Sequence, residues 1–284
     1  MIARPRPRHG VSRGRAVVLL VLTICAVVFV LLPAWVVVVN SFKSIGESKT
    51  LDLELPRRWM IVENYSTVFA QSQIVRGFVN SVVITVSAVA LLLITGAMAS
   101  WTFARSRSRT VRGLYLVAIA GILVPPAIIP SIAILRFTGL QGTQPGLVVF
   151  YAALLMAVTV FIITGFVRGI PMELEDAARI DGCGEVGVFF RIVLPLLRPV
   201  LLSVGILLTI IVWTEFFSAF LILSGRESQT LPLGLWYVSS GSANQVRWNL
   251  VMTHVVLVSA PLLLFYFIIQ RRLIGGVLGG GLKG

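Results

Sequence analysis

Few side chains in this sequence combine the residue types and the spacing that chemistry requires. Carboxylates gather in a single stretch, which holds Glu173, Glu175, Asp176, Asp181 and Glu185. Clustered carboxylates could serve an enzyme as acid and base. Acidic residues at the start of a helix are also stabilised by the positive end of the helix dipole, and that simpler explanation accounts for this stretch. We therefore do not expect an active site here.

The remaining reactive side chains are scattered. His9 and His254 stand alone, so neither a His-Glu-x-x-His metal motif nor a Ser/His/Asp triad can be assembled. No phosphate-binding Gly-x-x-x-x-Gly-Lys-Ser/Thr loop occurs, and the glycine-rich tail at residues 275–284 lacks the strand and helix that a nucleotide site needs. Cys25 and Cys183 fall in segments predicted to lie at different levels, which argues against a disulfide. We expect no catalytic residue, metal or cofactor on this chain. Because the chain has no phosphate-binding loop, any ATP that its function required would have to be hydrolysed by another polypeptide.

Composition explains why polar groups are so few. Of the 284 residues, 57% are hydrophobic and 12% are charged, whereas a water-soluble domain is about 25% charged. Six apolar runs are long enough to span a bilayer; they cover residues 16–39, 77–104, 113–135, 137–167, 199–223 and 248–270. The first run is too long for a signal-peptide core, so we expect a retained helix. The sequence predicts an all-α integral membrane protein with six transmembrane helices.

The basic residues indicate how these helices are oriented. Sixteen of the 24 Lys and Arg residues lie in the N-terminal segment, the second and fourth connectors and the C-terminal segment. Because basic residues in short loops resist translocation, both termini are predicted to be cytoplasmic. The expected parts are a basic N-terminal segment, a transmembrane domain and a cytoplasmic tail, at residues 1–15, 16–270 and 271–284. The net charge of +13 then reflects membrane topology, and a nucleic-acid partner is not expected.

One formal charge, Glu215, lies well inside an apolar run. Burying a carboxylate in a membrane is unfavourable unless a partner or water satisfies it. Glu215 is therefore either a functional group that faces the helix bundle or a cavity, or a residue near the outer end of the fifth helix that is satisfied locally. The sequence leaves both interpretations open. Pro125, Pro126 and Pro130 interrupt the third run, and a packing kink explains them better than a binding site.

The connector between the fourth and fifth runs, residues 168–199, is unlike a plain loop. Pro171 suits a first helical turn, the acidic residues after it favour the start of a helix, and Gly182 is a natural stop. We predict a capped helix of about ten residues at the cytoplasmic surface. Three- and four-residue spacing predicts one shared face for Leu174, Ala177, Ala178 and Asp181. Small alanines would let a partner approach closely, although an ordinary amphipathic interfacial helix would show the same pattern.

This connector resembles the cytoplasmic signature of the membrane permeases of binding-protein-dependent ATP-binding-cassette (ABC) importers. That signature reads Glu-Ala-Ala, three residues, Gly, nine residues and Ile-x-Leu-Pro. Here Asp176-Ala177-Ala178 is followed by three residues, Gly182, nine residues and Ile192-Val193-Leu194-Pro195. Asp176 replaces the usual Glu, whose role Glu175 can share, and Cys183 replaces a commonly small Ala. Neither difference reverses a charge or adds much volume.

Shorter stretches resemble the carbohydrate branch of that family, specifically the second permease of maltose- and glycerol-phosphate-like systems. They are Ser41-Phe42-Lys43, Glu63-Asn64-Tyr65, Asn80-Ser81, Trp213-Thr214-Glu215-Phe216, residues 230–235 and the terminal Gly-Gly-Leu-Lys283-Gly284. The resemblance implies a type I importer permease fold in a bacterial or archaeal inner membrane. It also implies that the substrate is a sugar delivered by an extracytoplasmic substrate-binding protein.

In the resembled importers, the short cytoplasmic helix docks on an ATPase subunit, and closure of the ATPase dimer tilts the membrane helices. The resemblance therefore implies an ATPase-coupling site at Glu175, Asp176, Ala177, Ala178, Asp181 and Gly182. Such a movement needs a stiff helix with bends beside it, and these bends are expected in the connector at Gly182, Gly184, Gly187, Pro195 and Pro199. The implied partners are an ATPase dimer that binds ATP and Mg, a second homologous permease, the binding protein and membrane lipid.

Further predictions concern the substrate path. Trp213, Trp236 and Trp248 offer flat faces for sugar rings beside Glu215, but aromatic belts at membrane interfaces explain isolated tryptophans at least as well. In the resembled permeases, the loop that corresponds to residues 224–247 reaches toward the substrate-binding protein, and the same is expected here. A permease for glycerol phosphate or another polyol-like solute fits as an alternative. An ion-coupled secondary transporter fits less well, because it would need intramembrane carboxylate pairs or repeats.

Overall fold

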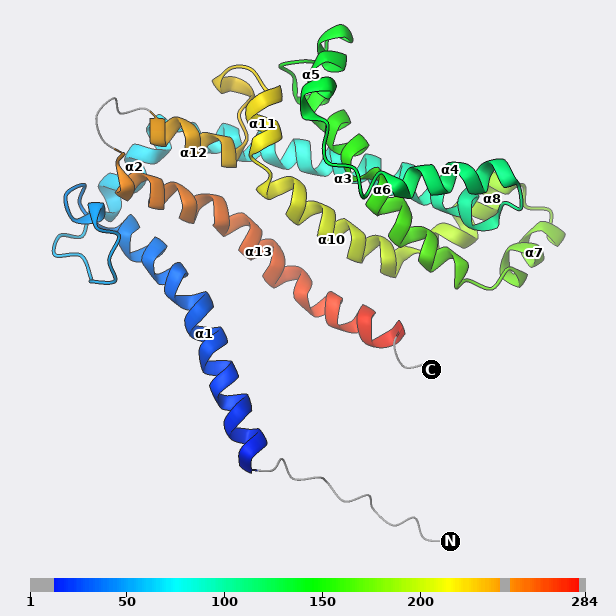
Figure 1. Cartoon of the computed structure of the whole chain (residues 1–284), viewed down its shortest axis with the longest axis horizontal. Coiled ribbons are helices and arrows are strands. Elements are labelled where there is room, and N and C mark those ends of the chain that lie inside the picture. The colour runs from blue at the N-terminus through cyan, green and yellow to red at the C-terminus, as the bar shows by residue number, and fades with distance from the viewer. Residues whose placement is uncertain (1–12, 241–245, 281–284) are drawn as a thin grey trace. The chain divides into compact units, whose positions relative to one another are not determined.

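The computed structural model describes residues 13–240 and 246–280, which fold almost entirely into helices (Figure 1). The α-helices are α1 (Arg13–Ser41), α2 (Ile61–Gln71), α3 (Ile74–Arg105), α4 (Arg109–Ala120), α5 (Ile128–Phe137), α6 (Gln144–Arg168), α7 (Glu173–Ile180), α8 (Glu185–Val188), α9 (Leu194–Leu196), α10 (Arg198–Thr214), α11 (Phe217–Ile222), α12 (Leu231–Ser240) and α13 (Trp248–Gly280). Short 3-10 turns occur at Glu47–Lys49 and Arg226–Ser228, and a π-helical segment occupies Phe189–Val193.

The chain divides into two compact units. The first contains Met1–Val68 and Ser239–Val256, and the second contains Phe69–Val238 and Leu257–Gly284. Helix α13 therefore contributes its first turns to the first unit and its remainder to the second. The connector that carries the importer signature lies entirely in the second unit.

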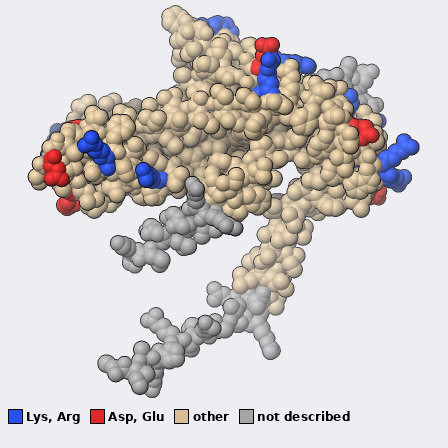
Figure 2. All heavy atoms as spheres, turned by 180° about the vertical axis from the view of Figure 1, so that it is seen from behind, with Lys and Arg blue, Asp and Glu red and all other residues tan. Residues whose placement is uncertain are grey.

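Four helices among the described residues are long and apolar enough to cross a membrane: Val17–Ser41, Ile74–Arg105, Gln144–Arg168 and Trp248–Gln270. A fifth span results if two helical stretches bent by 72°, Glu185–Leu196 and Arg198–Thr214, are counted together. Most of the surface visible in Figure 2 carries no charge, and the charged side chains lie in a few separate patches. These features agree with a multi-pass membrane protein, whose apolar surface faces lipid.

The third predicted run, residues 113–135, is not a continuous helix. It is divided between α4 and α5, with a break over residues 121–127. Pro125 and Pro126 lie in this break. Proline lacks a backbone N–H and disfavours helical geometry in the residue before it, so two in tandem interrupt the hydrogen bonding of the helix. The interruption is larger than the packing kink that the sequence predicts.

The fifth predicted run, residues 199–223, is also divided. Helix α10 ends at Thr214, the backbone is extended at Glu215, and α11 begins at Phe217. Before α10 the chain passes through the π-helical segment and bends by 72°. Pro195 and Pro199 flank this bend, as the sequence predicts, and proline and π-helical insertions are common causes of such kinks.

The core of the second unit lies where α3, α6 and α10 pack together (Figure 1). Its buried apolar side chains include Leu92, Ala97, Ile163, Val167, Val204 and Leu208. A second buried cluster includes Ile84, Tyr151, Val212 and Ile222. Because α3 contributes to both clusters, it runs through the whole packed part of this unit.

Buried polar contacts join two of the short sequence motifs in the first unit. Asn64 Nδ2 donates to the carbonyl oxygens of Ser41 and Lys43, each at 2.9 Å. Asn249 Nδ2 donates to Asn64 Oδ1 at 2.8 Å. The Lys43 ammonium pairs with Asp52, and its hydrogen bond is the main reason that the pKa of Asp52 is lowered to about 2. These motif residues therefore build the connection between α1 and α2.

Two further motifs meet in the second unit. Asn80 Nδ2 donates to the carbonyl oxygens of Glu227 and Gln229, each at 2.9 Å, and Ser81 Oγ accepts the N–H of Leu231 at 2.9 Å. The stretch predicted as an outer loop, residues 224–247, thus includes the helix α12, and its residues 227–231 pack on the start of α3. Residues 241–245 of that stretch lie outside the described residues.

Candidate functional site

Helix α7 lies in the connector where the sequence predicts the coupling site. It spans Glu173–Ile180, eight residues instead of about ten, with three acidic residues in its first turn. The helix ends just before Gly182, whose φ is +85°. Glycine adopts this left-handed conformation easily because it has no Cβ. The short helix that the sequence predicts to stop at Gly182 is confirmed, but Pro171 precedes its first turn and no side chain caps its start.

The two sides of α7 differ in exposure. Glu175 and Ala178 are buried, with 0% and 7% of their surface exposed. Leu174, Ala177 and Asp181 are exposed. The prediction that Ala178 shares a face with these three residues is wrong. Adjacent helical residues point about 100° apart, so Ala178 points well away from Ala177, and α7 is turned so that Ala178 and Glu175 are buried while Leu174 stays exposed.

The buried carboxylate of Glu175 is held by the end of α3. Trp101 Nε1 donates to Glu175 Oε2 at 3.0 Å, and Arg105 Nε donates to Glu175 Oε1 at 2.8 Å. Arg105 Nη2 also donates to the carbonyl oxygen of Ile170 at 2.8 Å. The Glu175 side chain is 1% exposed and that of Arg105 is 14% exposed. This ion pair is therefore largely shielded from water.

The other charged residues of this segment form an exposed network. Arg179 contacts the carboxylates of Asp176 and Glu185, each at 2.9 Å, and its guanidinium also lies 3.8 Å from the carboxylate of Glu175. The side chains of Asp176 and Glu185 are 58% and 65% exposed. Water and salt screen such pairs, which contribute little to stability. The network presents Asp176 at the surface but does not anchor α7.

The glycines that follow α7 do not all lie at bends. Gly182 is left-handed, and Gly184 has extended backbone directly before α8, so both lie in the break between the two short helices. Gly187 lies inside α8, and the prediction of a bend there is wrong. In Figure 2, charged side chains of both signs gather at the end of the second unit where Figure 1 places α7 and α8.

Glu215 lies in the break between α10 and α11. Tyr151 Oη donates to Glu215 Oε2 at 2.7 Å, and the Ser218 N–H donates to Oε1 at 2.9 Å. A longer contact of 3.4 Å joins the Ala219 N–H to Oε2. Unpaired N–H groups at the start of a helix are satisfied by such a carboxylate. Of the two interpretations that the sequence leaves open, these contacts support local satisfaction.

Replacing Tyr151 with phenylalanine is expected to lower the free energy of unfolding by about 1 to 2 kcal/mol, because it removes a hydroxyl that donates to a charged acceptor. The backbone donors still hold Glu215, so the fold should persist. Thermal unfolding of detergent-solubilised protein measures the loss. The control is Tyr266→Phe, at a tyrosine that is 49% exposed, and it should leave the unfolding midpoint unchanged. Equal midpoints for the two variants would contradict the role of this hydrogen bond.

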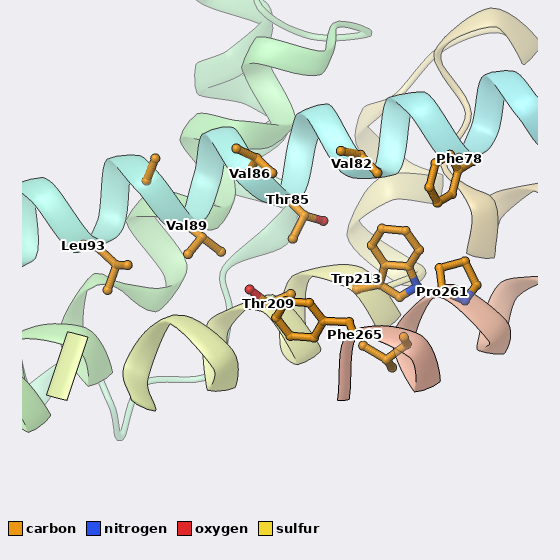
Figure 3. Close-up of a pocket in the computed structure, with 12 residues that line it drawn as sticks. Phe78, Val82, Thr85, Val86, Val89, Leu93, Thr209, Trp213, Pro261 and Phe265 are labelled. Carbon is orange, nitrogen blue, oxygen red and sulfur yellow. The ribbon is translucent and has the colours of Figure 1, made fainter. Parts of the chain in front are cut away.

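Trp213 lines a cavity in the second unit. The cavity measures about 470 Å³ and lies between α3, α10 and α13 (Figure 3). Its lining is apolar apart from Thr85, Thr209 and the indole of Trp213, whose N–H donates to the carbonyl oxygen of Val258 at 3.4 Å. Phe78 meets Trp213 edge-on, with ring centroids 6.1 Å apart. Such walls suit the flat apolar face of a sugar ring but offer few partners for its hydroxyls.

The three tryptophans predicted near the substrate path do not line one cavity. Trp213 belongs to the cavity lining. Trp236 lies on α12, where it meets Phe220 edge-on at 5.2 Å and is 46% exposed. Trp248 is the first residue of α13 and belongs to the first unit. The geometry therefore favours Trp213 among these candidates.

Sequence comparison places this chain among transport proteins. Residues 92–278 match the family described as binding-protein-dependent transport system inner membrane component. The chain is 32% identical to the diacetylchitobiose uptake system permease protein NgcG of Streptomyces coelicolor, over 89% of this chain and 84% of the relative. It is also 32% identical to the probable starch degradation products transport system permease protein AmyC of Thermoanaerobacterium thermosulfurigenes, over 88% of this chain and 91% of the relative. The melibiose/raffinose/stachyose import permease protein MelC of Bacillus subtilis is 26% identical, over 89% of this chain and 91% of the relative.

Solved structures show the same fold. A chain in the crystal structure of a bacterial ABC transporter involved in the import of the acidic polysaccharide alginate matches with a TM-score of 0.82 at 20% identity, covering 94% of this chain and 99% of that chain. A second crystal structure of a bacterial alginate ABC transporter, in complex with an alginate pentasaccharide-bound periplasmic protein, matches with a TM-score of 0.63 at 13% identity, covering 90% and 93%. The chain therefore belongs to the binding-protein-dependent transport inner membrane components, the membrane permeases of ABC importers, in which ATP is hydrolysed on a separate subunit.

Proposed function

We propose that this chain is one of two homologous membrane subunits of an ATP-driven sugar importer. Three relatives are named for the uptake of diacetylchitobiose, of starch degradation products and of melibiose, raffinose and stachyose. Their substrates support a sugar as the substrate of this chain. An extracytoplasmic substrate-binding protein delivers the sugar, and an ATPase dimer that binds ATP and Mg drives its passage.

The proposed topology has six spans, both termini in the cytoplasm, in the inner membrane of a bacterium or archaeon. Four continuous apolar helices and the bent pair that ends in α10 supply five of the spans. The pair α4 and α5, broken at tandem prolines, supplies the third span in chain order. The distribution of Lys and Arg supports the orientation. This arrangement corresponds to a type I importer permease.

The main structural support for this proposal is that one side of α7 is buried and the other is exposed. Glu175 and Ala178 fix its inner side, whereas its outer side includes Ala177 and Ile180, the latter 87% exposed. A large apolar side chain this exposed on a charged helix favours contact with a partner. We assign Asp176, Ala177, Asp181 and Gly182 to contact with the ATPase, and Glu175 and Ala178 to holding the helix in place.

Trp213 is the candidate for the substrate path. It lines the cavity together with Thr85 and Thr209. An apolar wall with few hydrogen-bonding groups suits a brief contact with a passing sugar better than tight binding. Glu215 supports the path indirectly, because its contacts hold the break between α10 and α11 beside Trp213.

The alternatives make different predictions for transport. A permease for glycerol phosphate or another polyol-like solute would share the fold and the coupling helix. An ion-coupled secondary transporter would need a carboxylate that gains and loses a cation. The Glu215 carboxylate already accepts hydrogen bonds from Tyr151 and Ser218, which disfavours that role.

Reconstitution of the complete complex tests the proposal. The chain is purified with its ATPase and second permease, placed in proteoliposomes and supplied with the binding protein and a panel of sugars and glycerol 3-phosphate. We expect a sugar to stimulate ATP hydrolysis and uptake to require ATP. Stimulation by glycerol 3-phosphate alone would select the polyol alternative. Uptake by this chain alone, driven by an ion gradient, would overturn the proposal.

A further inference from the structure

The buried contact between α3 and α7 fixes the direction as well as the position of α7. Glu175 accepts a hydrogen bond on each carboxylate oxygen, from Trp101 and from Arg105, and both donors lie at the end of α3. Two bonds to a planar group restrict its rotation, and the charge of the carboxylate strengthens both of them, the more so for the bond from the cationic Arg105. Helix α7 cannot turn or shift relative to the end of α3 without breaking these bonds.

Apolar packing surrounds this contact. The Trp101 ring lies 5.5 Å from the ring of Phe189 in the π-helical segment. Ala178, on the same side of α7 as Glu175, belongs to the buried cluster that contains Val188 and Phe189. Losing one partner of a buried ion pair leaves an uncompensated charge, which opposes separation. The inner side of α7 and the end of α3 are therefore held together as one assembly.

The covalent connections of α7 are more pliable than this contact. Residues 169–172 link α6 to α7 outside any α-helix. After α7, the left-handed Gly182 and the extended Gly184 lead to α8, and the π-helical segment and the 72° bend precede α10. If α7 moved, these breaks would bend, and little of the movement would reach α6 or α10 through the backbone.

Helix α3, in contrast, is continuous for 32 residues and contains no proline. One face of α3, from Phe78 to Leu93, forms a wall of the cavity opposite Trp213 and Phe265 (Figure 3). At 1.5 Å per residue, Leu93 lies about 18 Å along the helix axis from Arg105. A displacement at Arg105 is therefore carried to the cavity wall by an uninterrupted helix.

We infer that Trp101, Arg105 and Glu175 form a joint that delivers movement of α7 to α3, and through α3 to the wall of the cavity. Glu175 is a positioning residue in this arrangement, because it faces α3 while the exposed residues of α7 face the ATPase. The inference rests on the proposed function, since it takes α7 as the docking element. A weakened joint reduces the number of sugar molecules moved for each ATP hydrolysed.

The variant Glu175→Gln tests the joint in the complete reconstituted complex. The amide keeps an acceptor but removes the ion pair with Arg105 and the longer one, at 3.8 Å, with Arg179. We expect the ATPase to co-purify with this variant and the sugar transported per ATP hydrolysed to fall about tenfold. Glu185→Gln is the matched control, because it makes the same change at an exposed side chain of the same connector, and it should keep the parent ratio. If Glu175→Gln transported as much sugar per ATP hydrolysed as the unmodified complex, the inference would be overturned.

A second variant covers the case in which Glu175→Gln fails to assemble. Trp101→Phe keeps an aromatic ring beside Phe189 and removes the N–H that donates to Glu175. We expect a smaller fall in sugar transported per ATP hydrolysed than in Glu175→Gln. If Trp101→Phe instead kept the ratio of the unmodified complex, the inference would be overturned, whether or not Glu175→Gln assembles. Failure of the ATPase to co-purify with the parent chain would instead refute the proposed function, so the two failures are distinguishable.

Discussion

Replacing Gly182 with tryptophan is expected to abolish ATP-dependent sugar uptake while the protein still inserts into the membrane. Gly182 follows α7 at a φ of +85°, and a Cβ there would meet no described atom within 4 Å. The substitution therefore adds about 1 to 2 kcal/mol of backbone strain without a clash. It also places a bulky ring beside the surface proposed to dock on the ATPase. Uptake into proteoliposomes and the amount of protein in the membrane measure the two outcomes.

Gly139 provides a matched control for that experiment. It lies between α5 and α6, has a φ of +72°, and a Cβ there would also meet no described atom within 4 Å. Gly139→Trp thus adds similar strain away from α7, and uptake should stay near the parent level. Equal losses in the two variants would indicate strain instead of lost docking. Retained uptake and sugar-stimulated ATP hydrolysis in Gly182→Trp would show that the coupling role is wrong.

Apolar length predicted the continuous helices well, but proline content alone did not predict where helices break. Pro33 and Pro261 lie inside α1 and α13, and both helices continue past them. The tandem Pro125-Pro126 instead separates α4 from α5. A single missing N–H can be compensated by neighbouring groups, whereas two consecutive prolines remove two donors and restrict the preceding residue. Compensation of this kind depends on tertiary contacts that a hydropathy pattern does not contain.

Helix α7 could be predicted because its signals are local, whereas the contacts that anchor it could not, because its partners are distant in the sequence. The acidic first turn and Gly182 bound α7 within ten residues of sequence. Arg105, which holds Glu175, is 70 residues away in the chain. The same reason left Glu215 ambiguous, since Tyr151 lies 64 residues before it. Sequence spacing identifies caps and helix ends, but it does not identify which buried groups will pair.

The family motifs show a related limit. In the sequence, Asn80-Ser81 and the stretch at residues 230–235 are two separate motifs that resemble the carbohydrate branch. In the structure they contact one another, because Ser81 Oγ accepts the N–H of Leu231. Such motif residues stabilise packing, and their role follows from a contact between segments 150 residues apart. The resemblance located them but gave no physical reason for them.

Replacing Ala177 with tryptophan is expected to eliminate uptake by preventing the ATPase from docking. Ala177 is exposed on the outer side of α7, so a larger side chain meets water in this chain alone and its stability should change by less than about 0.5 kcal/mol. A close-fitting partner surface has no room for the added ring, and overpacking of an interior costs about 1 to 3 kcal/mol or more. Co-purification of the ATPase with the variant, together with uptake, measures the effect.

Two controls separate docking from folding in that experiment. Ala178→Trp introduces the same ring on the buried side of α7, among Val188 and Phe189, and should lower the unfolding midpoint of the chain itself. Thr110→Trp introduces it at an exposed position of α4, on the side of the membrane predicted to be cytoplasmic, and should leave both stability and uptake intact. Normal recovery of the ATPase with Ala177→Trp would show that this face of α7 is not the docking surface. Loss of the ATPase from Ala177→Trp, with the parent unfolding midpoint, requires that the exposed side of α7 contacts it directly.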